Sequence, residues 1–480
     1  MKEDFLSLDE AGYDKFLSSL EKKNEELNAF NFINKKWNKG FIISVKDNIC
    51  VSDMPATASS KLLEGYTPNF DATVVERLKK NGFFIMGKTN MDEFGFGSFG
   101  LNSDKIAHNP FNPEYVAGGS SSGSAIATAL IKNHVSIAES TGGSISTPAA
   151  FCGVVGLTPT YGAISRYGLI DYSNSLDKIG FMGKNADSIR KVMEIAAGPD
   201  YKDTTSVSVK INRLKKDKIY VVENLLKNVQ QTLMDRFQGL LDKLSSLGYK
   251  IEKVKIKDIE YSVPAYYIIS MAEASTNLAK YQGFKYGYKL KDFSLSYNDF
   301  FTLARKEFGL EAKRRIILGT FIRGRSFRQK YYEKALYVRY KIIERMKTFL
   351  KDGFILSPVM PIFTPKIDEI REITPVESYS MDMLTIPPNL CGFPHMAFPY
   401  YYEKGMPIGA KSGSNMKPYS SSVSFSLDAK VSLFCSLYVL VSVLTSSLFF
   451  MHKDCLLISY SAAFIRFLIP VIFFTSTLFH

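Results

Sequence analysis

Between residues 42 and 197, short apolar stretches alternate with stretches of helical pattern. Residues 83–88 follow a helical stretch and are typical of a buried strand, and residues 154–157 lead into another. Strands that alternate with helices assemble into a sheet on which the helices pack, so this part of the chain predicts an α/β fold covered on both faces. A chain of 480 residues with 46% hydrophobic content can fill such a core as one large domain or two.

The remaining segments differ in pattern. Residues 1–40 predict a polar amphipathic helix, with Leu20, Leu27 and Phe30 at helical spacing. A loop, a strand, an amphipathic helix, a long helical stretch and a final strand are predicted over residues 198–216, 219–222, 226–248, 265–350 and 354–358. We therefore expect one unit over residues 1–410, composed of 1–40, a core at 41–200 and a second half at 201–410, and a distinct segment at 411–480.

Two glycine- and serine-rich clusters, at residues 118–124 and 141–144, predict tight loops that each present a hydroxyl. Glycine permits the backbone conformations that such loops need, and it lets amide N–H groups converge on an anion. Lys46 stands upstream, where an apolar run breaks into charged residues. One lysine with two serines, Ser120 and Ser144, and no histidine nearby, predicts a serine nucleophile whose base is an amine.

Other interpretations of these loops fit less well. A phosphate-binding loop needs Gly-Lys-Ser/Thr or the spacing GxGxxG, and neither is present. A flexible linker does not fit the apolar helical run at residues 125–131, which begins directly after the first cluster. A histidine triad lacks support because His108, His134 and His395 show no partner pattern.

The clusters are parts of longer motifs. These motifs occupy residues 116–125, 140–145, 148–153, 156–162, 165–169 and 175–180. Together they resemble the amidase signature family, and the last three are similar to its glutamine-hydrolysing subunits of tRNA-dependent amidotransferases. The resemblance extends over about residues 28 to 410. It implies an amidase-signature α/β fold with a mixed β-sheet core between helices.

The resemblance also implies roles for individual residues. Ser144 matches the nucleophile, Ser120 the bridging serine after a cis peptide bond, and Lys46 the base. The amides of Thr141, Gly142, Gly143 and Ser144 match the oxyanion hole. Because an amine accepts a proton only when it is neutral, burial of Lys46 has to favour its uncharged form.

This chain departs from the family at two positions beside the nucleophile. Ser140 stands where the family usually has aspartate, and Ser146 where it usually has arginine. The two hydroxyls either replace a supporting ion pair or leave a weakened site.

In the second half, the resemblance places Tyr266, Arg315 and Asp382 in the pocket for the amino-acid substrate. Guanidinium binds carboxylate through two hydrogen bonds, and a buried carboxylate binds ammonium. The alternative is that Arg315 belongs to a solvated basic helix together with Lys313 and Arg314.

We therefore expect a glutaminase that releases ammonia for a partner subunit, which amidates misacylated Glu-tRNA(Gln), with Asp-tRNA(Asn) as a second candidate. The expected partners are a kinase/transamidase subunit, a small linker subunit, and tRNA through the complex. No cofactor or metal is expected in this chain; ATP and Mg²⁺ are expected in the partner subunit. Two alternatives stay open: a free-standing amidase on acyl or aryl amides, anchored to a membrane by the tail, and a catalytically weak scaffold subunit.

Charge and cysteine content are compatible with this expectation. The net charge of +13 suits an RNA-handling complex, although no RNA-recognition motif is present. The five cysteines are scattered without CxxC spacing, so neither a zinc site nor a disulfide framework is indicated. The N-terminus lacks the pattern of a signal peptide, and a cytoplasmic location is expected.

The composition changes after residue 410. Residues 431–451 carry no charge and are long enough to span a membrane, and a second apolar run at 455–479 is interrupted by Arg466 and Pro470. One interpretation is a membrane hairpin. The other is a frame change or a wrong exon end, because the departure from the family is abrupt.

Overall fold

A computed structural model describes residues 5–209, 211–212, 216–290, 294–413 and 423–424. Its centre is an 11-stranded mixed sheet in the order β1-β3-β2-β4-β6-β5-β11-β12-β10-β8-β9. The strands are β1 (Phe30–Ile33), β2 (Phe41–Lys46), β3 (Phe83–Thr89), β4 (Val135–Ser140), β5 (Val155–Thr158), β6 (Lys178–Gly183), β8 (Lys218–Val222), β9 (Lys250–Val254), β10 (Gly353–Pro358), β11 (His395–Glu403) and β12 (Met406–Gly413). A separate short pair joins β7 (Ile211–Asn212) to β13 (Val423–Ser424).

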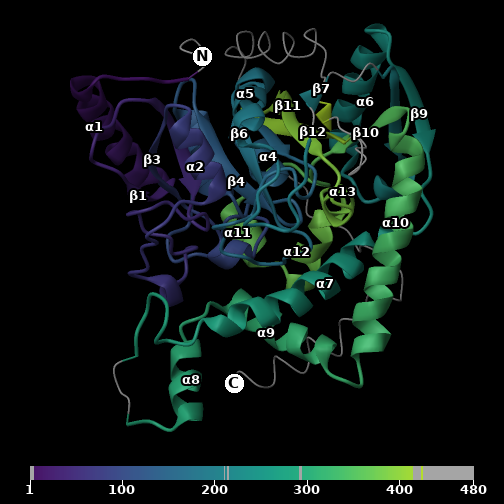
Figure 1. Cartoon of the computed structure of the whole chain (residues 1–480). Helices are drawn as coiled ribbons and strands as arrows, with labels where there is room; N and C mark the ends of the chain where they lie inside the picture. The colour runs from purple at the N-terminus through teal and green to yellow at the C-terminus, as the bar shows by residue number, and fades with distance from the viewer. Residues whose placement is uncertain (1–4, 210, 213–215, 291–293, 414–422, 425–480) are drawn as a thin grey trace.

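Helices lie on both faces of the sheet (Figure 1). They are α1 (Glu10–Leu27), α2 (Thr73–Lys80), α3 (Ser122–Leu130), α4 (Ser146–Phe151), α5 (Ala186–Ala196), α6 (Gln231–Ser246), α7 (Ser262–Asn277), α8 (Tyr297–Arg305), α9 (Leu310–Arg323), α10 (Lys334–Leu350), α11 (Ile367–Arg371), α12 (Pro375–Ser380) and α13 (Ile386–Leu390). The predicted α/β fold with a mixed sheet is confirmed.

Alternate residues of each central strand enter different cores. Ile43 packs in a cluster that includes α2 and α5, whereas its neighbour Ile42 packs in a cluster that includes α1 and α3. Successive side chains of a strand point to opposite faces, so this division requires apolar residues at both the odd and the even positions of the strand. The continuous apolar runs of β2 and β3 in the sequence have this cause.

Three details of the predicted pattern were wrong. Phe30 begins β1 and does not continue the first helix, which ends at Leu27 with Asn28 in the left-handed conformation. The strand at residues 353–358 is not the last, because the hairpin β11–β12 follows and completes the middle of the sheet. The helical stretch is interrupted between α7 and α8.

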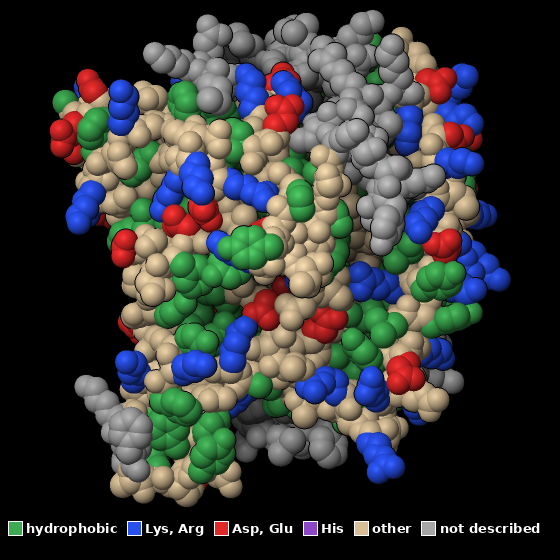
Figure 2. All heavy atoms as spheres, viewed as in Figure 1, with side chains coloured by type: hydrophobic (Ala, Val, Ile, Leu, Met, Phe, Trp, Pro, Cys, Tyr) green, Lys and Arg blue, Asp and Glu red, His purple; other side chains and the backbone are tan. Residues whose placement is uncertain are grey.

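Helices α7 and α9 pack very closely and carry residues of the predicted substrate pocket. A Cβ at Gly319 of α9 would lie 1.9 Å from the carbonyl oxygen of Met271 in α7, so this contact requires glycine. The close approach brings Tyr266 and Arg315 to the same side of the sheet. Basic side chains are frequent along the neighbouring edge, where α10 lies, with hydrophobic side chains between them (Figure 2).

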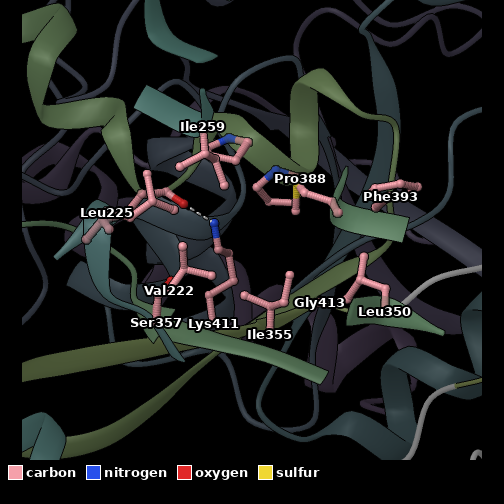
Figure 3. A pocket seen from close by; sticks show the side chains of 13 residues that line it. Val222, Leu225, Ile259, Leu350, Ile355, Ser357, Pro388, Phe393, Lys411 and Gly413 are labelled. Carbon is pink, nitrogen blue, oxygen red and sulfur yellow. Dashed lines mark hydrogen bonds between the residues drawn. The ribbon is translucent and has the colours of Figure 1, made fainter. Parts of the chain in front are cut away.

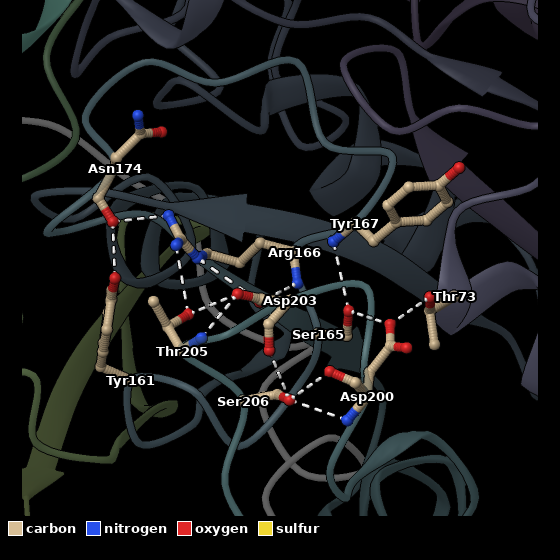
Figure 4. Close-up of polar contacts among 10 residues, drawn as sticks. All are labelled: Thr73, Tyr161, Ser165, Arg166, Tyr167, Asn174, Asp200, Asp203, Thr205 and Ser206. Atoms are coloured by element: carbon tan, nitrogen blue, oxygen red, sulfur yellow. Dashed lines mark hydrogen bonds and ion pairs between the residues drawn. The ribbon is translucent and has the colours of Figure 1, made fainter.

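A polar network anchors the long connection between β5 and β6 (Figure 4). The Arg166 amide donates to Asp203 Oδ2 at 2.8 Å, and its guanidinium donates to Thr205 at 3.1 Å. Ser165 and Thr73 both donate to Asp200 Oδ2, each at 2.6 Å. The network ties this connection to the loop after α5, and so fixes the segment that delivers residues 172 and 177 to the site.

The apolar runs at 431–451 and 455–479 lie outside the described residues. Among the helices that are described, none is both long and apolar enough to cross a bilayer.

Candidate active site

The first predicted pair is in contact. Lys46, at the end of β2, is completely buried and donates from Nζ to Ser120 Oγ at 2.8 Å. Ser120 follows a cis peptide bond from Gly119 and precedes α3, which begins at Ser122. A lysine and a serine in this arrangement can exchange a proton, provided that the lysine is neutral.

Ser144 lies beside this pair, in the second glycine-rich loop. Its backbone carbonyl accepts from the Ser121 amide at 3.2 Å, and its side chain retains some exposure, with the residue 6% exposed. No hydrogen bond joins the Ser144 and Ser120 hydroxyls in the described part of the chain, so the structure brings the loops together without closing the whole predicted relay.

The loop at 141–144 can offer amide donors. Within the described ranges, the N–H groups of Gly142, Gly143 and Ser144 donate to no other backbone group. A Cβ at Gly142 would lie 2.5 Å from the Tyr266 hydroxyl oxygen, and one at Gly143 would lie 2.6 Å from Thr385 Oγ1. These contacts leave room for glycine alone at both positions, and they place the Tyr266 hydroxyl against Gly142.

Glu139 is a site residue that the sequence reasoning missed. This carboxylate is 1% exposed and accepts from Lys46 Nζ at 2.9 Å and from Asn48 at 3.3 Å. The signal was a charged residue at the end of an apolar strand, directly before the glycine loop. Recognising it required the register of β4 beside β2, in which Val45 is opposite Ile137.

The two departures from the family motif do not pair with each other. Ser140 donates to Asn389 Oδ1 at 3.3 Å. The buried hydroxyl of Ser146 has no hydrogen-bond partner among the residues that the structure describes. The loop is therefore supported from residue 140 by an amide on α13 rather than by an ion pair with residue 146.

The three predicted substrate residues are buried near one another, and the charge of Arg315 acts on both Tyr266 and Asp382. Asp382 accepts from Tyr267 at 2.6 Å and from Ser98 at 2.8 Å. Burial raises the pKa of Asp382 to about 6, although both donors and the charge of Arg315 act in the opposite direction. Burial also raises the pKa of Tyr266, so this hydroxyl stays protonated and can donate.

Arg315 does not belong to a solvated helix face. Its guanidinium is surrounded by aromatic rings, with Phe96 at 5.0 Å and Tyr172 at 5.3 Å from the ring centroids. It donates through Nε to Glu311 at 2.8 Å and through Nη1 to the Tyr172 hydroxyl. The Arg315 side chain is 4% exposed, whereas that of Arg314 is 29% exposed, so Arg315 is the buried cation of this helix.

An apolar pocket elsewhere in the fold contains Lys411 (Figure 3). The ammonium of Lys411 donates to the Leu384 carbonyl, and burial lowers its pKa to about 7. The wall of this pocket includes Val222, Leu225 and Ile355, and it contains none of the catalytic candidates.

We searched the described part of the chain for clusters of metal-ligating residues and for paired cysteines. No group of three or more His, Cys, Asp or Glu residues there is arranged to hold a metal ion. Cys50, Cys152 and Cys391 are buried free thiols.

Known proteins are similar to this chain in sequence and in fold. The amidase family model matches residues 16–414. The A subunit of glutamyl-tRNA(Gln) amidotransferase from Sulfolobus acidocaldarius is 42% identical over 394 residues, which cover 79% of this chain and 82% of the relative. That of Saccharolobus solfataricus is 40% identical over 411 residues, covering 83% and 86%. The crystal structure of the same protein from Thermotoga maritima superposes with a TM-score of 0.70 at 34% identity, covering 83% of this chain and 86% of that chain. The chain therefore belongs to the amidase family, in the branch of the glutamyl-tRNA(Gln) amidotransferase A subunits.

Proposed function

We propose that this chain hydrolyses glutamine as the A subunit of a glutamyl-tRNA(Gln) amidotransferase, with Ser144 as nucleophile. Ser144 Oγ attacks the side-chain amide carbon of glutamine while its proton passes through Ser120 to neutral Lys46. Lys46 then returns the proton through the same serine to the amide nitrogen of the substrate, which leaves as ammonia. Water hydrolyses the acyl-enzyme and releases glutamate.

The developing oxyanion is held by the amides of residues 141–144, under the ring of Tyr266. One such donor is worth about 3–4 kcal/mol of transition-state stabilisation. Supporting this role, Gly142, Gly143 and Ser144 donate to no other backbone group within the described residues.

Glutamine itself is held by its α-amino-acid end. Arg315 binds the carboxylate, and Asp382 accepts from the ammonium. Both groups are buried. Asp382 has no ion pair within the described ranges, and Arg315 bonds Glu311 and Tyr172 through Nε and Nη1, which leaves Nη2 for a carboxylate. A pocket with one fixed cation and one fixed anion favours a zwitterionic amino acid over a simple acyl or aryl amide, which is why we prefer glutamine to the substrates of a free-standing amidase.

The partners follow from the relatives' names. A protein named as one lettered component of an amidotransferase works beside other components. We propose an assembly of a transamidase subunit that uses ATP and Mg²⁺, a small linker subunit, and misacylated tRNA. The site on this chain would supply ammonia, and the amidation of Glu-tRNA(Gln) would occur on the partner.

The contact between Lys46 and Ser120, beside the loop of Ser144, is the observation on which this proposal depends. The test is covalent labelling with a glutamine analogue that carries an electrophile, followed by peptide mass spectrometry. We expect the adduct on Ser144, its loss in Ser144→Ala, and slow residual labelling in Ser120→Ala. An adduct on Ser121 or Cys152 would refute the assignment.

A further inference from the structure

A single segment, residues 92–98, contacts both the loop of Ser120 and the proposed substrate pocket. It begins shortly after β3, which ends at Thr89, and its backbone turns sharply, with Phe94 in the left-handed region at φ 50°. This conformation is uncommon for a phenylalanine, and it is kept only where the surroundings enforce it. The segment is therefore held in one shape by its neighbours on both sides.

On one side, the segment holds both ends of the residue pair Gly119–Ser120. The Asp92 amide donates to the Ser120 carbonyl at 3.1 Å, and the Ser98 carbonyl accepts from the Gly119 amide at 2.8 Å. The Ser120 hydroxyl is the group that lies 2.8 Å from Lys46 Nζ. The geometry of the proposed proton relay thus depends on where residues 92 and 98 lie.

On the other side, the same segment contacts both charged groups of the pocket. The Ser98 hydroxyl donates to Asp382 Oδ2 at 2.8 Å. The guanidinium carbon of Arg315 lies 5.0 Å from the centroid of the Phe96 ring. Ser98 therefore forms two hydrogen bonds in opposite directions, because its side chain holds the pocket carboxylate and its carbonyl holds the amide next to Ser120.

The two carboxylate oxygens of Asp382 have different surroundings. Oδ2 accepts from Tyr267 at 2.6 Å and from Ser98 at 2.8 Å, whereas no hydrogen bond reaches Oδ1 from the residues that the structure describes. Oδ1 is therefore the oxygen that can accept from a substrate ammonium while Ser98 keeps Oδ2. A carboxylate bound at both oxygens is fixed in its plane, so the ammonium and Ser98 each restrict the position of the other.

We propose that Ser98 couples recognition of the glutamine ammonium at Asp382 to the position of Ser120. This inference rests on the proposed function, in which Asp382 binds the ammonium and Ser120 passes the proton. An ammonium on Oδ1 holds the carboxylate, the carboxylate holds the Ser98 hydroxyl, and the Ser98 carbonyl holds the amide beside Ser120. Binding energy from the end of the substrate that does not react then favours the geometry of the relay, which increases kcat. Ser98 is a positioning residue that acts through Asp382 and the loop of Ser120.

The test compares glutamine with glutaramate, which is the same molecule without the α-amino group. Ammonia release from both is measured with the assembled enzyme, in the presence of its partner subunits, tRNA and ATP, for the unchanged chain, Ser98→Ala and Ser98→Thr. The deciding quantity is the ratio of kcat for glutamine to kcat for glutaramate, because it measures what the ammonium contributes to the reacting step. A loop that is only distorted would lower both kcat values and leave their ratio in place.

Tyr267→Phe is the matched control. Tyr267 donates to the same oxygen of Asp382 as Ser98 does, and within the described ranges it forms no hydrogen bond with the loop of Ser120. Each of the two substitutions removes one donor from a buried carboxylate, so Ser98→Ala and Tyr267→Phe should both raise KM for glutamine by roughly tenfold.

The ratio of the kcat values should separate the two variants. In the unchanged chain we expect a ratio of about ten, an ordinary size for coupling between two sites. Ser98→Ala should reduce the ratio to about two or less, and Ser98→Thr, which keeps the hydroxyl, should restore most of it. Tyr267→Phe should keep a ratio near that of the unchanged chain, because the link from Asp382 to Ser120 is intact.

Three outcomes would overturn the inference and leave the proposed function in place: a ratio near one in the unchanged chain, a ratio that Ser98→Ala does not reduce, or an equal fall in Tyr267→Phe. If Ser98→Ala loses its cooperative thermal transition, Ser98→Cys decides, because a thiol fills similar space and is a weak donor, and an undiminished ratio there would overturn the inference. Failure of the unchanged chain to release ammonia from glutamine in the assembled enzyme would instead refute the proposed function, and the inference would fall with it.

Discussion

Replacing Arg315 with alanine tests whether the buried cation of α9 is the carboxylate-binding residue. Truncating one partner of a buried, hydrogen-bonded charge pair costs about 2–5 kcal/mol. At about 1.4 kcal/mol for each factor of ten, kcat/KM for glutamine should fall by a factor of roughly 30 to 3,000. Most of the loss should appear in KM, because Arg315 holds the part of the substrate that does not react.

The structure offers a control substitution at Arg314, and it indicates that the loss of Arg315 should not unfold the protein. Arg314 contacts the same Glu311 but is 29% exposed in its side chain, so Arg314→Ala should cost about 1 kcal/mol or less. Loss of Arg315 does not strip Glu311 of partners, since Tyr379 donates to it at 2.6 Å and Arg314 stays beside it. The Arg315→Ala protein should therefore fold, with a lowered thermal midpoint.

The measurement is steady-state glutamine hydrolysis with the partner subunits present, combined with calorimetric titration of glutamine into Ser144→Ala and Ser144→Ala/Arg315→Ala. The double variant should bind glutamine too weakly to detect. Arg315→Lys should recover part of the affinity, because it keeps the charge and loses the planar fork. Equal losses from Arg314→Ala and Arg315→Ala, with both proteins folded, would refute this assignment of the pocket.

Two further predictions concern buried charges. Asp382→Asn should weaken glutamine binding and raise the thermal midpoint at about pH 8. The pKa of Asp382 is about 6 in the folded protein, above its unfolded value, so the folded protein loses stability as the pH rises from about 4 to about 6. Thermal scans should therefore show that the gain from the substitution vanishes at about pH 4. Lys411→Met should stabilise the fold by a few kcal/mol at about pH 7. The pKa of Lys411 is about 7 in the folded protein, so between about pH 10 and pH 7 only the unfolded state gains the proton, and the folded state loses stability over this range. Chemical denaturation should show a smaller gain from the substitution at about pH 10 than at about pH 7, and an equal gain at both would contradict this account.

The sequence predicted the strands and helices in which apolar residues follow a regular spacing. Strand β3 is buried at every position because both faces are covered, and it begins with four apolar residues. Helix α3 carries its apolar residues from Ala125 onward because it follows the glycine loop into the core. The hairpin β11–β12 escaped prediction for a related reason. Its first strand carries Pro399 and three consecutive tyrosines that are only half-buried, so its pattern resembled neither a buried strand nor an alternating one.

The sequence motifs name candidate site residues but not the charged groups beside them. Ser120, Ser144 and Lys46 stand in motifs that identify them one by one. The partners Glu139 and Glu311 stand in no such motif, and each becomes significant only through a contact fixed by the fold. For Glu139 this contact depends on strand register, and for Glu311 on one helical turn that brings it beside Arg315 and on a tyrosine 68 residues away.

The topology explains why charged groups converge at this place in an otherwise apolar core. Strands β2, β3 and β4 run parallel, so their carboxyl ends meet at one edge of the sheet. In open α/β sheets the crevice beyond these ends is where ligands bind, because the loops there leave backbone amides and polar side chains unpaired by the sheet. Lys46 ends β2, and the segment that contains Glu139 and leads to Ser144 ends β4. A substitution that alters charge at either strand end therefore changes the chemistry of the site with little effect on the apolar middle of the strands, which carries the stability of the fold.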